Sequence, residues 1–405
     1  MFVVIFVSLV DLKNVVQDEV DLKREILEDT ACFLYENPEL GSEEYEAVEL
    51  LTQILDEHGF EIKRDLYGMP TAFSAVYRGL GEGPRVAVLA EYDALPEVGH
   101  GGGHNLVAGA AVGAAIGASR ALGLVNGEVV VVGTPAEGGH GVSAGSKKVL
   151  AESGFFRDVN AVLMCRPGEV YSVGIPTLGV RNVRMVFKGQ ASHAAESPEL
   201  GRNALNAATL CYTATHMLRQ EARRDANLVI HGFLPEAGVQ GNIIPDTAVC
   251  SVGVRSSDDA YLDVMTERVA QCGEGAAIAM DVEVEITKRK QYAAKKLNLP
   301  LVMALWENYM RLGVDPVPWV DSVGGIPRDS NDLGNVSQRV PVVDSYLGVR
   351  GPGVPAYSRQ MADLTVTRMG LNAMIVGAKA LGMTMVELIA KPQLLDDAKE
   401  YFGSH

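Results

Sequence analysis

Short apolar runs alternate with helical segments in the first part of the chain, and this alternation limits the fold more than any other feature. Strand-like runs occur at Ala72–Ala75, Val86–Leu89, Glu128–Val132 and Ala161–Met164. Apolar residues at helical spacing, with acidic first turns, occupy Ile26–Leu34 and Glu43–His58. Strands that alternate with helices are typical of a mostly parallel sheet covered by helices. The sequence therefore predicts an α/β fold.

The pattern changes after Gly174. The expected elements that follow are strands at Val180–Lys188, Leu228–Phe233, Ala248–Arg255 and Ala279–Ile286, and helices at Ala204–Ala222 and Ala260–Glu274. Their β-α-β-β-α-β order predicts an inserted α+β domain of ferredoxin-like type. We therefore predict a catalytic domain at 1–174 plus 291–405, closing with helices Leu364–Leu381 and Thr384–Ile389, and an inserted domain at 175–290.

The composition narrows the classes of partner. The 405 residues are enough for two domains, and their formal net charge is −16. Nucleic acids and anionic membranes bind positive patches, so neither is an expected partner. The five cysteines are scattered, and their odd number favours free thiols and a cytoplasmic location. Met1–Val10 is apolar but lacks the basic start and cleavage site of a secretory signal, so we expect a tail or a helix start.

The segment from Ala90 to Asn105 holds the densest group of candidate ligands. The apolar run Val86–Leu89 leads into the acidic residues Glu91 and Asp93. A glycine-rich turn then carries His100 and His104 just before the small-residue helix expected at 105–122. A strand end followed by a helix start is where α/β proteins place their chemistry.

This segment and several later motifs resemble the amidohydrolase branch of the aminoacylase and carboxypeptidase metallohydrolases. That branch has G-H-G-C-G-H-N, P-A-E-E, M-H-P-G and a P-x-H-T-like segment. This chain has Gly102 in place of the cysteine, Glu137-Gly138 in place of the two glutamates, Arg166 in place of the histidine of M-H-P-G, and Tyr357 in place of the last histidine. Four of the five usual metal ligands are therefore absent, and His104 remains. The resemblance extends through 189–195, 242–245 and 331–337, and it implies that the inserted domain is a lid or dimerisation domain.

The resemblance implies roles for the residues that match. Glu137 would be the general base, and His104 a metal ligand. Glu91 and Asp93 could complete a site for one weakly held divalent transition metal, manganese or zinc. His100 or His140 could also replace a lost ligand, and this choice stays open. His193 would be a catalytic residue that polarises the scissile carbonyl from the lid.

Other matching positions are expected to bind substrate. Asn242 and Arg255 match lid residues that contact substrate oxygens or a carboxylate. Arg166 cannot coordinate a metal, because its guanidinium stays charged, but it could hold a substrate carboxylate through two parallel hydrogen bonds. The alternative is that Arg166 pairs internally with Glu91 or Asp93. Tyr357 could stack on a substrate or donate a hydrogen bond to it, and plain core packing is the alternative.

Altered chemistry on a small anionic aromatic substrate is the expected function. We expect hydrolytic removal of the amino group of 5-nitroanthranilate, giving 5-nitrosalicylate and ammonia, because this reaction needs a base and no paired metals. The first alternative is cleavage of an N-acyl or aminobenzoyl amino acid, and the second is a noncatalytic relative. The resemblance further implies a homo-oligomer that forms through the lid domain.

Overall fold

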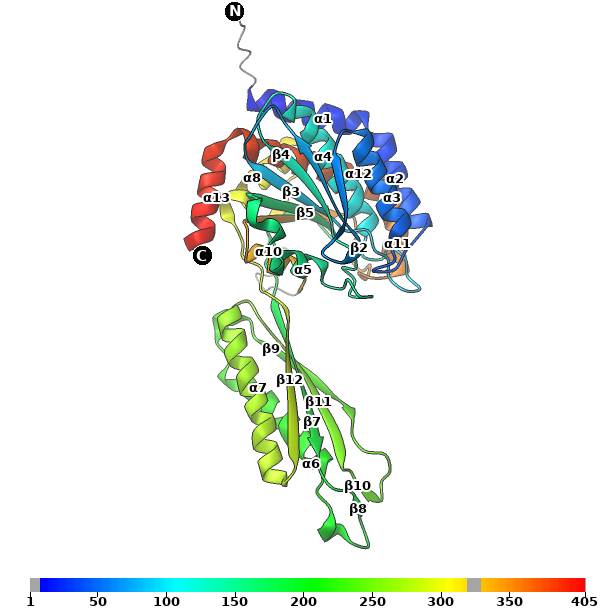
Figure 1. Cartoon of the computed structure of the whole chain (residues 1–405), viewed down its shortest axis with the longest axis vertical. Coiled ribbons are helices and arrows are strands. Elements are labelled where there is room, and N and C mark those ends of the chain that lie inside the picture. The colour runs from blue at the N-terminus through cyan, green and yellow to red at the C-terminus, as the bar shows by residue number, and fades with distance from the viewer. Residues whose placement is uncertain (1–7, 319–328, 405) are drawn as a thin grey trace, which may run out of the picture. The chain divides into compact units, whose positions relative to one another are not determined.

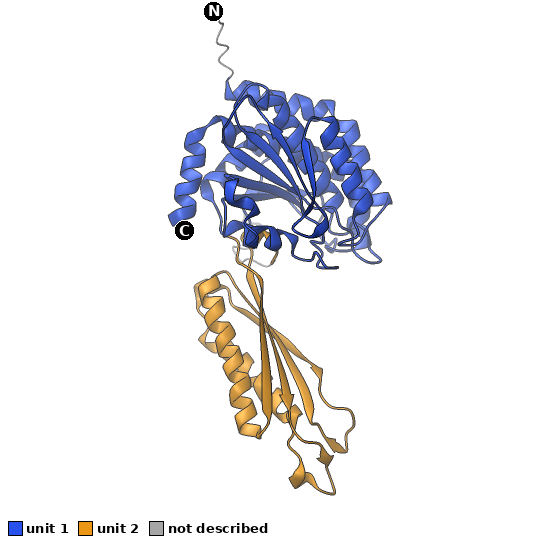
Figure 2. Ribbon diagram, in the orientation of Figure 1, with its two compact units in different colours: residues 1–175, 296–325, 335–405 blue, residues 176–295, 326–334 orange. Residues whose placement is uncertain are grey.

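The computed structural model describes residues 8–318 and 329–404, and these form two compact units (Figure 2). Unit 1 contains the described residues of Met1–Ile175, Lys296–Gly325 and Asn335–His405. Unit 2 contains those of Pro176–Lys295 and Ile326–Gly334. Each unit has its own apolar core, so each is described by itself.

Unit 1 is built on a mixed eight-stranded sheet with the order β1-β2-β4-β3-β5-β14-β6-β13 (Figure 1). The strands are β1 (Glu61–Leu66), β2 (Met69–Arg78), β3 (Arg85–Ala90), β4 (Glu128–Gly133), β5 (Ala161–Gly168), β6 (Ser172–Val173), β13 (Val317–Pro318) and β14 (Val342–Gly348). The central strands β4, β3, β5 and β14 are parallel to one another, whereas β1, β2 and β6 join in antiparallel pairs. The α/β fold class is therefore confirmed.

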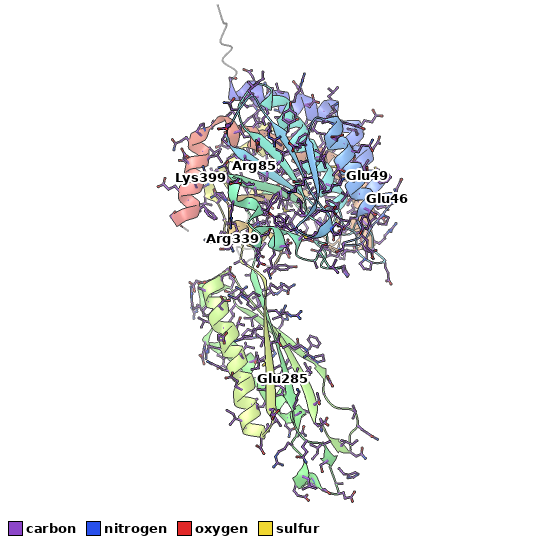
Figure 3. All side chains as sticks on the ribbon, in the orientation of Figure 1. Glu46, Glu49, Arg85, Glu285, Arg339 and Lys399 are labelled. Carbon is purple, nitrogen blue, oxygen red and sulfur yellow. The ribbon has the colours of Figure 1, made fainter. Side chains whose placement is uncertain are left out.

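Helices cover this sheet. They are α1 (Leu9–Leu22), α2 (Arg24–Glu36), α3 (Tyr45–Glu57), α4 (His104–Leu122), α5 (Ser146–Glu152), α8 (Leu299–Arg311), α11 (Arg359–Thr365), α12 (Arg368–Ala390) and α13 (Pro392–Ser404); α10 (Leu333–Ser337) spans a unit boundary. In α3 the side chains of Glu46 and Glu49 are exposed while Val48 and Leu51 are buried, which is the pattern of a surface helix (Figure 3).

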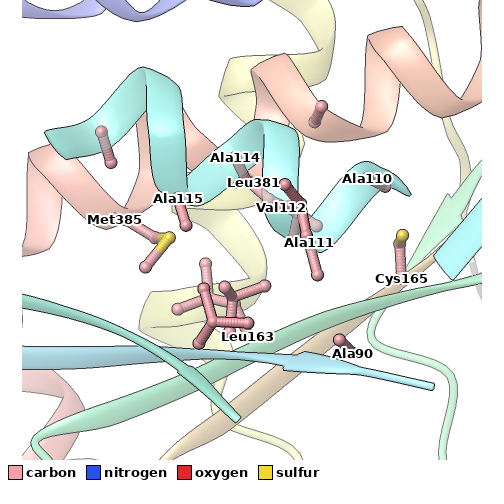
Figure 4. Packing of buried hydrophobic residues seen from close by; sticks show 14 of the residues in the cluster. Ala90, Ala110, Ala111, Val112, Ala114, Ala115, Leu163, Cys165, Leu381 and Met385 are labelled. Carbon is pink, nitrogen blue, oxygen red and sulfur yellow. The ribbon is translucent and has the colours of Figure 1, made fainter. Parts of the chain in front are cut away.

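The helices α4 and α12 pack against each other and against β3 (Figure 4). Both are long and apolar enough to cross a membrane, but 94% and 83% of their most apolar windows are buried inside the protein. Small residues allow the close approach, since a Cβ at Gly113 would lie 2.8 Å from Leu27 Cδ1 and 3.0 Å from Ala378 Cβ. The apolar character of the two helices is thus explained by their place in the core.

Unit 2 is a four-stranded antiparallel sheet with two helices. The strands are β7 (Gly179–Lys188), β9 (Val229–Glu236), β11 (Thr247–Ser256) and β12 (Glu283–Tyr292), in the order β12-β7-β11-β9. The helices α6 (Ala204–Met217) and α7 (Asp259–Met280) pack on this sheet. A short pairing of β8 (Ser192–His193) with β10 (Ile243–Ile244) forms a separate hairpin-like arm. Along the chain the strands of the four-stranded sheet and the two helices follow the order β-α-β-β-α-β, which is the ferredoxin-like order that the sequence predicts for this domain.

The structure differs from the expected elements at several points. At 1–10 we expected a tail or the start of a helix, and α1 does begin at Leu9. The two expected C-terminal helices form one helix, α12. The described part of 326–334 belongs to unit 2 because Leu178 N donates to Asp329 O and Arg255 Nη1 donates to Ser330 Oγ. The expected strand at 279–286 starts later, since α7 continues to Met280.

Candidate active site and metal centre

The ends of three neighbouring parallel strands of unit 1 bring the candidate residues together. Glu91 and Asp93 follow β3, and Glu137 follows β4 after a short turn. Arg166 lies near the end of β5, and His104 is the first residue of α4. Because β4, β3 and β5 are adjacent and parallel, their carboxyl ends lie at one edge of the sheet. Residues far apart in the sequence thus form one cluster.

Two cations hold one side of this cluster. Arg166 Nη2 donates to Glu91 Oε1 at 2.9 Å and to Glu137 Oε1 at 2.8 Å. Lys147, from the first turn of α5, places Nζ 2.7 Å from Glu91 Oε1. The side chains of Lys147 and Glu91 are both 0% exposed. Buried charges are costly unless they are paired and hydrogen-bonded, and these three carboxylate–cation contacts pair the buried charges of this site.

His104 occupies the other side. Its Nδ1 donates to Asp93 Oδ1 at 2.8 Å, and Asp93 Oδ2 accepts from Gly138 N at 2.8 Å. Its Nε2 lies 3.6 Å from Glu91 Oε2 and 3.4 Å from Glu137 Oε2. A carboxylate on one ring nitrogen fixes the orientation of the imidazole and directs the other nitrogen into the cluster.

The electrostatics of the cluster favour an ionised Glu137. Burial opposes ionisation, but the charge of Arg166, the hydrogen bond with His104 and the charge of Lys147 outweigh it and hold the pKa of Glu137 well below its usual range. For Glu91, burial is the largest effect and raises its pKa, while Arg166 and Lys147 act in the opposite direction. Burial also opposes the charge on His104, yet the nearby Asp93 carboxylate and its hydrogen bond raise the pKa of His104 well above 6.5.

The backbone at Glu137 is held in an uncommon conformation. Ala136, the residue before it, has φ 56°, in the left-handed region that side chains other than glycine rarely adopt. The buried Glu44 accepts from Ala136 N at 2.8 Å through Oε1 and from Thr71 Oγ1 at 2.7 Å through Oε2. Glu44 and Asp93 therefore fix the backbone on both sides of Glu137.

Comparisons with known proteins agree with this fold. No protein-family model matches the chain. It is 33% identical to a mouse (Mus musculus) Xaa-Arg dipeptidase, over 96% of this chain and 92% of that protein. It is 26% identical to one component of the p-aminobenzoyl-glutamate hydrolase of Escherichia coli, over 96% and 94% of the two chains. A Bacillus subtilis structure, described as a dinuclear metal binding peptidase from the M20 family, superposes with a TM-score of 0.72 at 19% identity, over 91% and 99% of the two chains.

The chain belongs to the family of this Xaa-Arg dipeptidase. The Bacillus subtilis structure is described as binding two metals, which raises the question of whether the residues present here fit such a pair. Among the described residues, one group of potential ligands is found, formed by Glu91, His104 and Glu137, whose ligand atoms lie within 4.8 Å of one another. Ligands in a tetrahedral shell at ~2.1 Å from an ion are separated by roughly 3.4 Å. The separations of 3.6 and 3.4 Å around His104 Nε2 are therefore compatible with one ion.

The residues that stand in place of the usual ligands do not fit a second ion. Gly102 and Gly138 offer no ligand atom, and Arg166 offers a cation. The space beside the glycines is also closed, since a Cβ at Gly102 would lie 3.0 Å from His104 Nε2, and one at Gly138 would lie 2.9 Å from Leu95 Cδ2.

Tyr357, a predicted substrate-binding residue, is 55% exposed and has φ 59°. Its backbone N donates to Gly101 O at 3.0 Å, beside the glycine-rich turn.

The remaining candidate ligands of unit 1 take other places. Asp93 lies behind His104, on its Nδ1 side, and is outside the three-residue group. His100 is buried, and burial lowers its pKa to about 4. His140 is exposed on the loop after Glu137. Neither His100 nor His140 belongs to the group formed by Glu91, His104 and Glu137, so neither of them takes the place of a lost ligand there.

The predicted catalytic residue His193 and the predicted substrate-binding residues Asn242 and Arg255 fall at two places in unit 2. His193 and Asn242 are exposed neighbours on the arm, where Ala194 N donates to Asn242 O at 2.9 Å. His193 Nδ1 accepts from Ala195 N at 3.2 Å and from Glu196 N at 3.1 Å. Arg255 lies on β11, half-buried, and donates to Ser330 Oγ at 3.0 Å. The roles of these three residues stay predictions.

Two residues of the site were not found from the sequence. Lys147 is one of two consecutive lysines, and nothing in the local sequence distinguishes it from Lys148. Glu44 lies at the start of a helical pattern where acidic residues are common. Arg166 was found, and the structure gives it the internal pairing considered as the alternative, with Glu91 and Glu137 in place of Asp93.

Proposed function

We propose that this chain is a hydrolase that cleaves the amide C–N bond of a small N-acyl amino acid, such as a dipeptide or an aminobenzoyl amino acid. The observation that carries the proposal is Glu137. It is a carboxylate at a strand end, in the position of the family's general base, and it is held ionised by Arg166 and His104. The relatives named as a dipeptidase and as an aminobenzoyl-glutamate hydrolase support the same bond type.

Glu137 would serve the reaction in two steps. Its Oε1 is held by Arg166 at 2.8 Å, and its Oε2 lies 3.4 Å from His104 Nε2. When Nε2 carries no proton, Oε2 would be free to accept a proton from water. The water oxygen forms a bond to the carbonyl carbon, and the proton held on Glu137 then passes to the amide nitrogen as the C–N bond breaks. One residue thus acts as base and then as acid, as amide hydrolysis requires.

One divalent ion, manganese or zinc, belongs to this proposal as a weakly held cofactor. Glu91 Oε2 and His104 Nε2 would hold it, and it would supply Lewis-acid polarisation of the substrate carbonyl. Two protein ligands are fewer than the three or four usual for catalytic metals, so we expect loose binding.

The names of the relatives favour amide hydrolysis over the ring deamination that the sequence predicts. They describe a dipeptidase and an aminobenzoyl-glutamate hydrolase, and neither describes removal of an aromatic amino group. We therefore place 5-nitroanthranilate second as a substrate. The small anionic substrate, the cytoplasmic location suggested by five free cysteines, and a homo-oligomer formed through unit 2 remain parts of the proposal.

A substrate panel tests the proposal. The purified full chain is incubated with an Xaa-Arg dipeptide, p-aminobenzoyl-glutamate and 5-nitroanthranilate, after metal removal and with added Mn²⁺ or Zn²⁺. We expect turnover of an amide substrate, with the rate highest when metal is added. Turnover of 5-nitroanthranilate alone would reverse the order of the two functions, and no turnover of any of the three would contradict the assignment as a hydrolase.

A further inference from the structure

Lys147 is a fully buried cation that the proposed hydrolysis does not use. It lies in the first turn of α5, after Gly145, and its side chain is 0% exposed. Lysines are almost never fully buried unless they are paired. Its Nζ lies 2.7 Å from Glu91 Oε1, and that same oxygen accepts from Arg166 at 2.9 Å. Two side-chain cations therefore meet at one carboxylate oxygen.

The two glutamates of the centre present different oxygens to its two sides. Glu91 Oε1 and Glu137 Oε1 contact the cations, whereas both Oε2 atoms face His104 Nε2. Glu91 Oε2 is buried and has no hydrogen-bond partner among the described residues, so this carboxylate atom is left for an ion. The Oε1 side already carries two fixed positive charges.

We propose that Lys147 and Arg166 together supply the positive charge that a metal pair supplies in dinuclear relatives. The centre then accepts at most one divalent ion, on its His104 side, and the chain folds without any. A second ion on the Oε1 side would meet a guanidinium and an ammonium at contact distance, and like charges at this separation repel strongly in a buried site. The inference shares its ion position with the proposed function, but it does not depend on the substrate.

Lys148 provides a matched control for Lys147. It is the next residue of the same helix, its side chain is 29% exposed, and its Nζ lies 3.9 Å from Glu152 Oε1, one turn away. Surface pairs of this kind contribute little to stability. Replacing either lysine with methionine removes one charge from α5 and keeps the length of the side chain, so the two variants differ mainly in burial.

The first measurement is the number of ions bound. Full-length protein is treated with EDTA and titrated with Co²⁺, with binding followed by calorimetry and by the visible absorption of the bound ion. We expect at most one Co²⁺ per chain, and loss of that ion in Glu91→Gln. Two ions per chain that both disappear in Glu91→Gln would overturn the inference.

The second measurement is thermal unfolding of the metal-free protein. We expect cooperative unfolding of the metal-free wild type and a Tm lower by about 10 °C in Lys147→Met, because Glu91 loses a buried partner, while Lys148→Met stays close to wild type. Added Co²⁺ should raise the Tm of Lys147→Met more than that of the wild type, which a purely packing role of Lys147 would not produce.

These outcomes are separate from activity. The inference would be contradicted by a metal-free wild type that is unfolded, or by a Lys147→Met variant whose Tm equals that of Lys148→Met. Either result would count even if amide hydrolysis is observed. If Lys147→Met does not fold, the wild-type stoichiometry still decides. Conversely, one ion per chain with no turnover of any amide would support the inference and contradict only the proposed function.

Discussion

Replacing Glu44 with glutamine should change how the stability of the protein depends on pH. The Glu44 carboxyl is buried and accepts hydrogen bonds from Ala136 N and Thr71 Oγ1. Burial is the largest effect on this group, and it raises the pKa from 4.5 to about 7. Glutamine keeps the size of the side chain and an oxygen for Ala136 N, but it has no proton to release.

The sign and size of the effect follow from this pKa. Because the folded protein holds the proton more tightly than the unfolded chain does, the stabilisation is fully present below pH ~4.5 and is lost as the pH rises to about 7. A shift of roughly 2.5 units corresponds to about 3 kcal/mol. The free energy of unfolding of Glu44→Gln, measured relative to wild type, should therefore increase by about 3 kcal/mol between these two pH values.

Urea unfolding of both proteins at pH values from 4.5 to 8 measures this difference. The exposed neighbour Glu43 gives the matched control, because Glu43→Gln removes the same charge from the same turn without changing a buried group. Its stability should run parallel to that of the wild type. If the Glu44→Gln curve is also parallel to the wild-type curve over the whole range, Glu44 does not titrate as described, and its role as a buried support of Ala136 must be revised.

Three further predictions concern other parts of the chain. Arg166→Met should lower the free energy of unfolding, measured in urea, by about 3–5 kcal/mol, because Glu91 and Glu137 lose a shared partner. Arg166→Lys should recover part of this loss. A stability of Arg166→Met equal to that of the wild type would show that the pairing is not formed. Gly113→Ala should cost about 1–3 kcal/mol through overpacking against Leu27 of α2 and Ala378 of α12. Gly403→Ala, whose added Cβ meets no described atom within 4 Å, should not, and equal effects would refute the close contact. His193→Asn should lower kcat by ~10²-fold without changing the Tm, since its side chain is exposed; unchanged kcat would remove His193 from the reaction.

Much of the fold could be predicted from local sequence patterns. The runs Val86–Leu89 and Glu128–Val132 became β3 and β4, and the β-α-β-β-α-β order of unit 2 was visible in the alternation of its segments. Boundaries were harder to predict. The apolar pattern of α12 continues through Thr384 without an interruption, so the two expected helices are one.

The candidate site could be predicted only where the sequence marks it by a motif. A strand end indicated Glu91, the family motif after a strand indicated Glu137, and the motif before a helix indicated His104. These three form the group that the structure brings together. Lys147 and Glu44 reach the site through long-range contacts, with Glu91 and with Ala136, that no local pattern encodes. The ligand losses suggested an unusual centre, but the sequence could not show that buried cations contact the carboxylates.

The rate of Glu137→Gln on an amide substrate tests the central claim most directly. Glutamine keeps the size of the side chain but cannot accept the proton, so kcat/KM for the Xaa-Arg dipeptide or p-aminobenzoyl-glutamate should fall by ~10²-fold or more. Glu128→Gln, at the other end of β4 in a surface ion-pair network, should keep the wild-type rate. A Glu137→Gln variant that is folded and retains most of the wild-type kcat/KM would contradict the assignment of Glu137 as the residue that moves the proton.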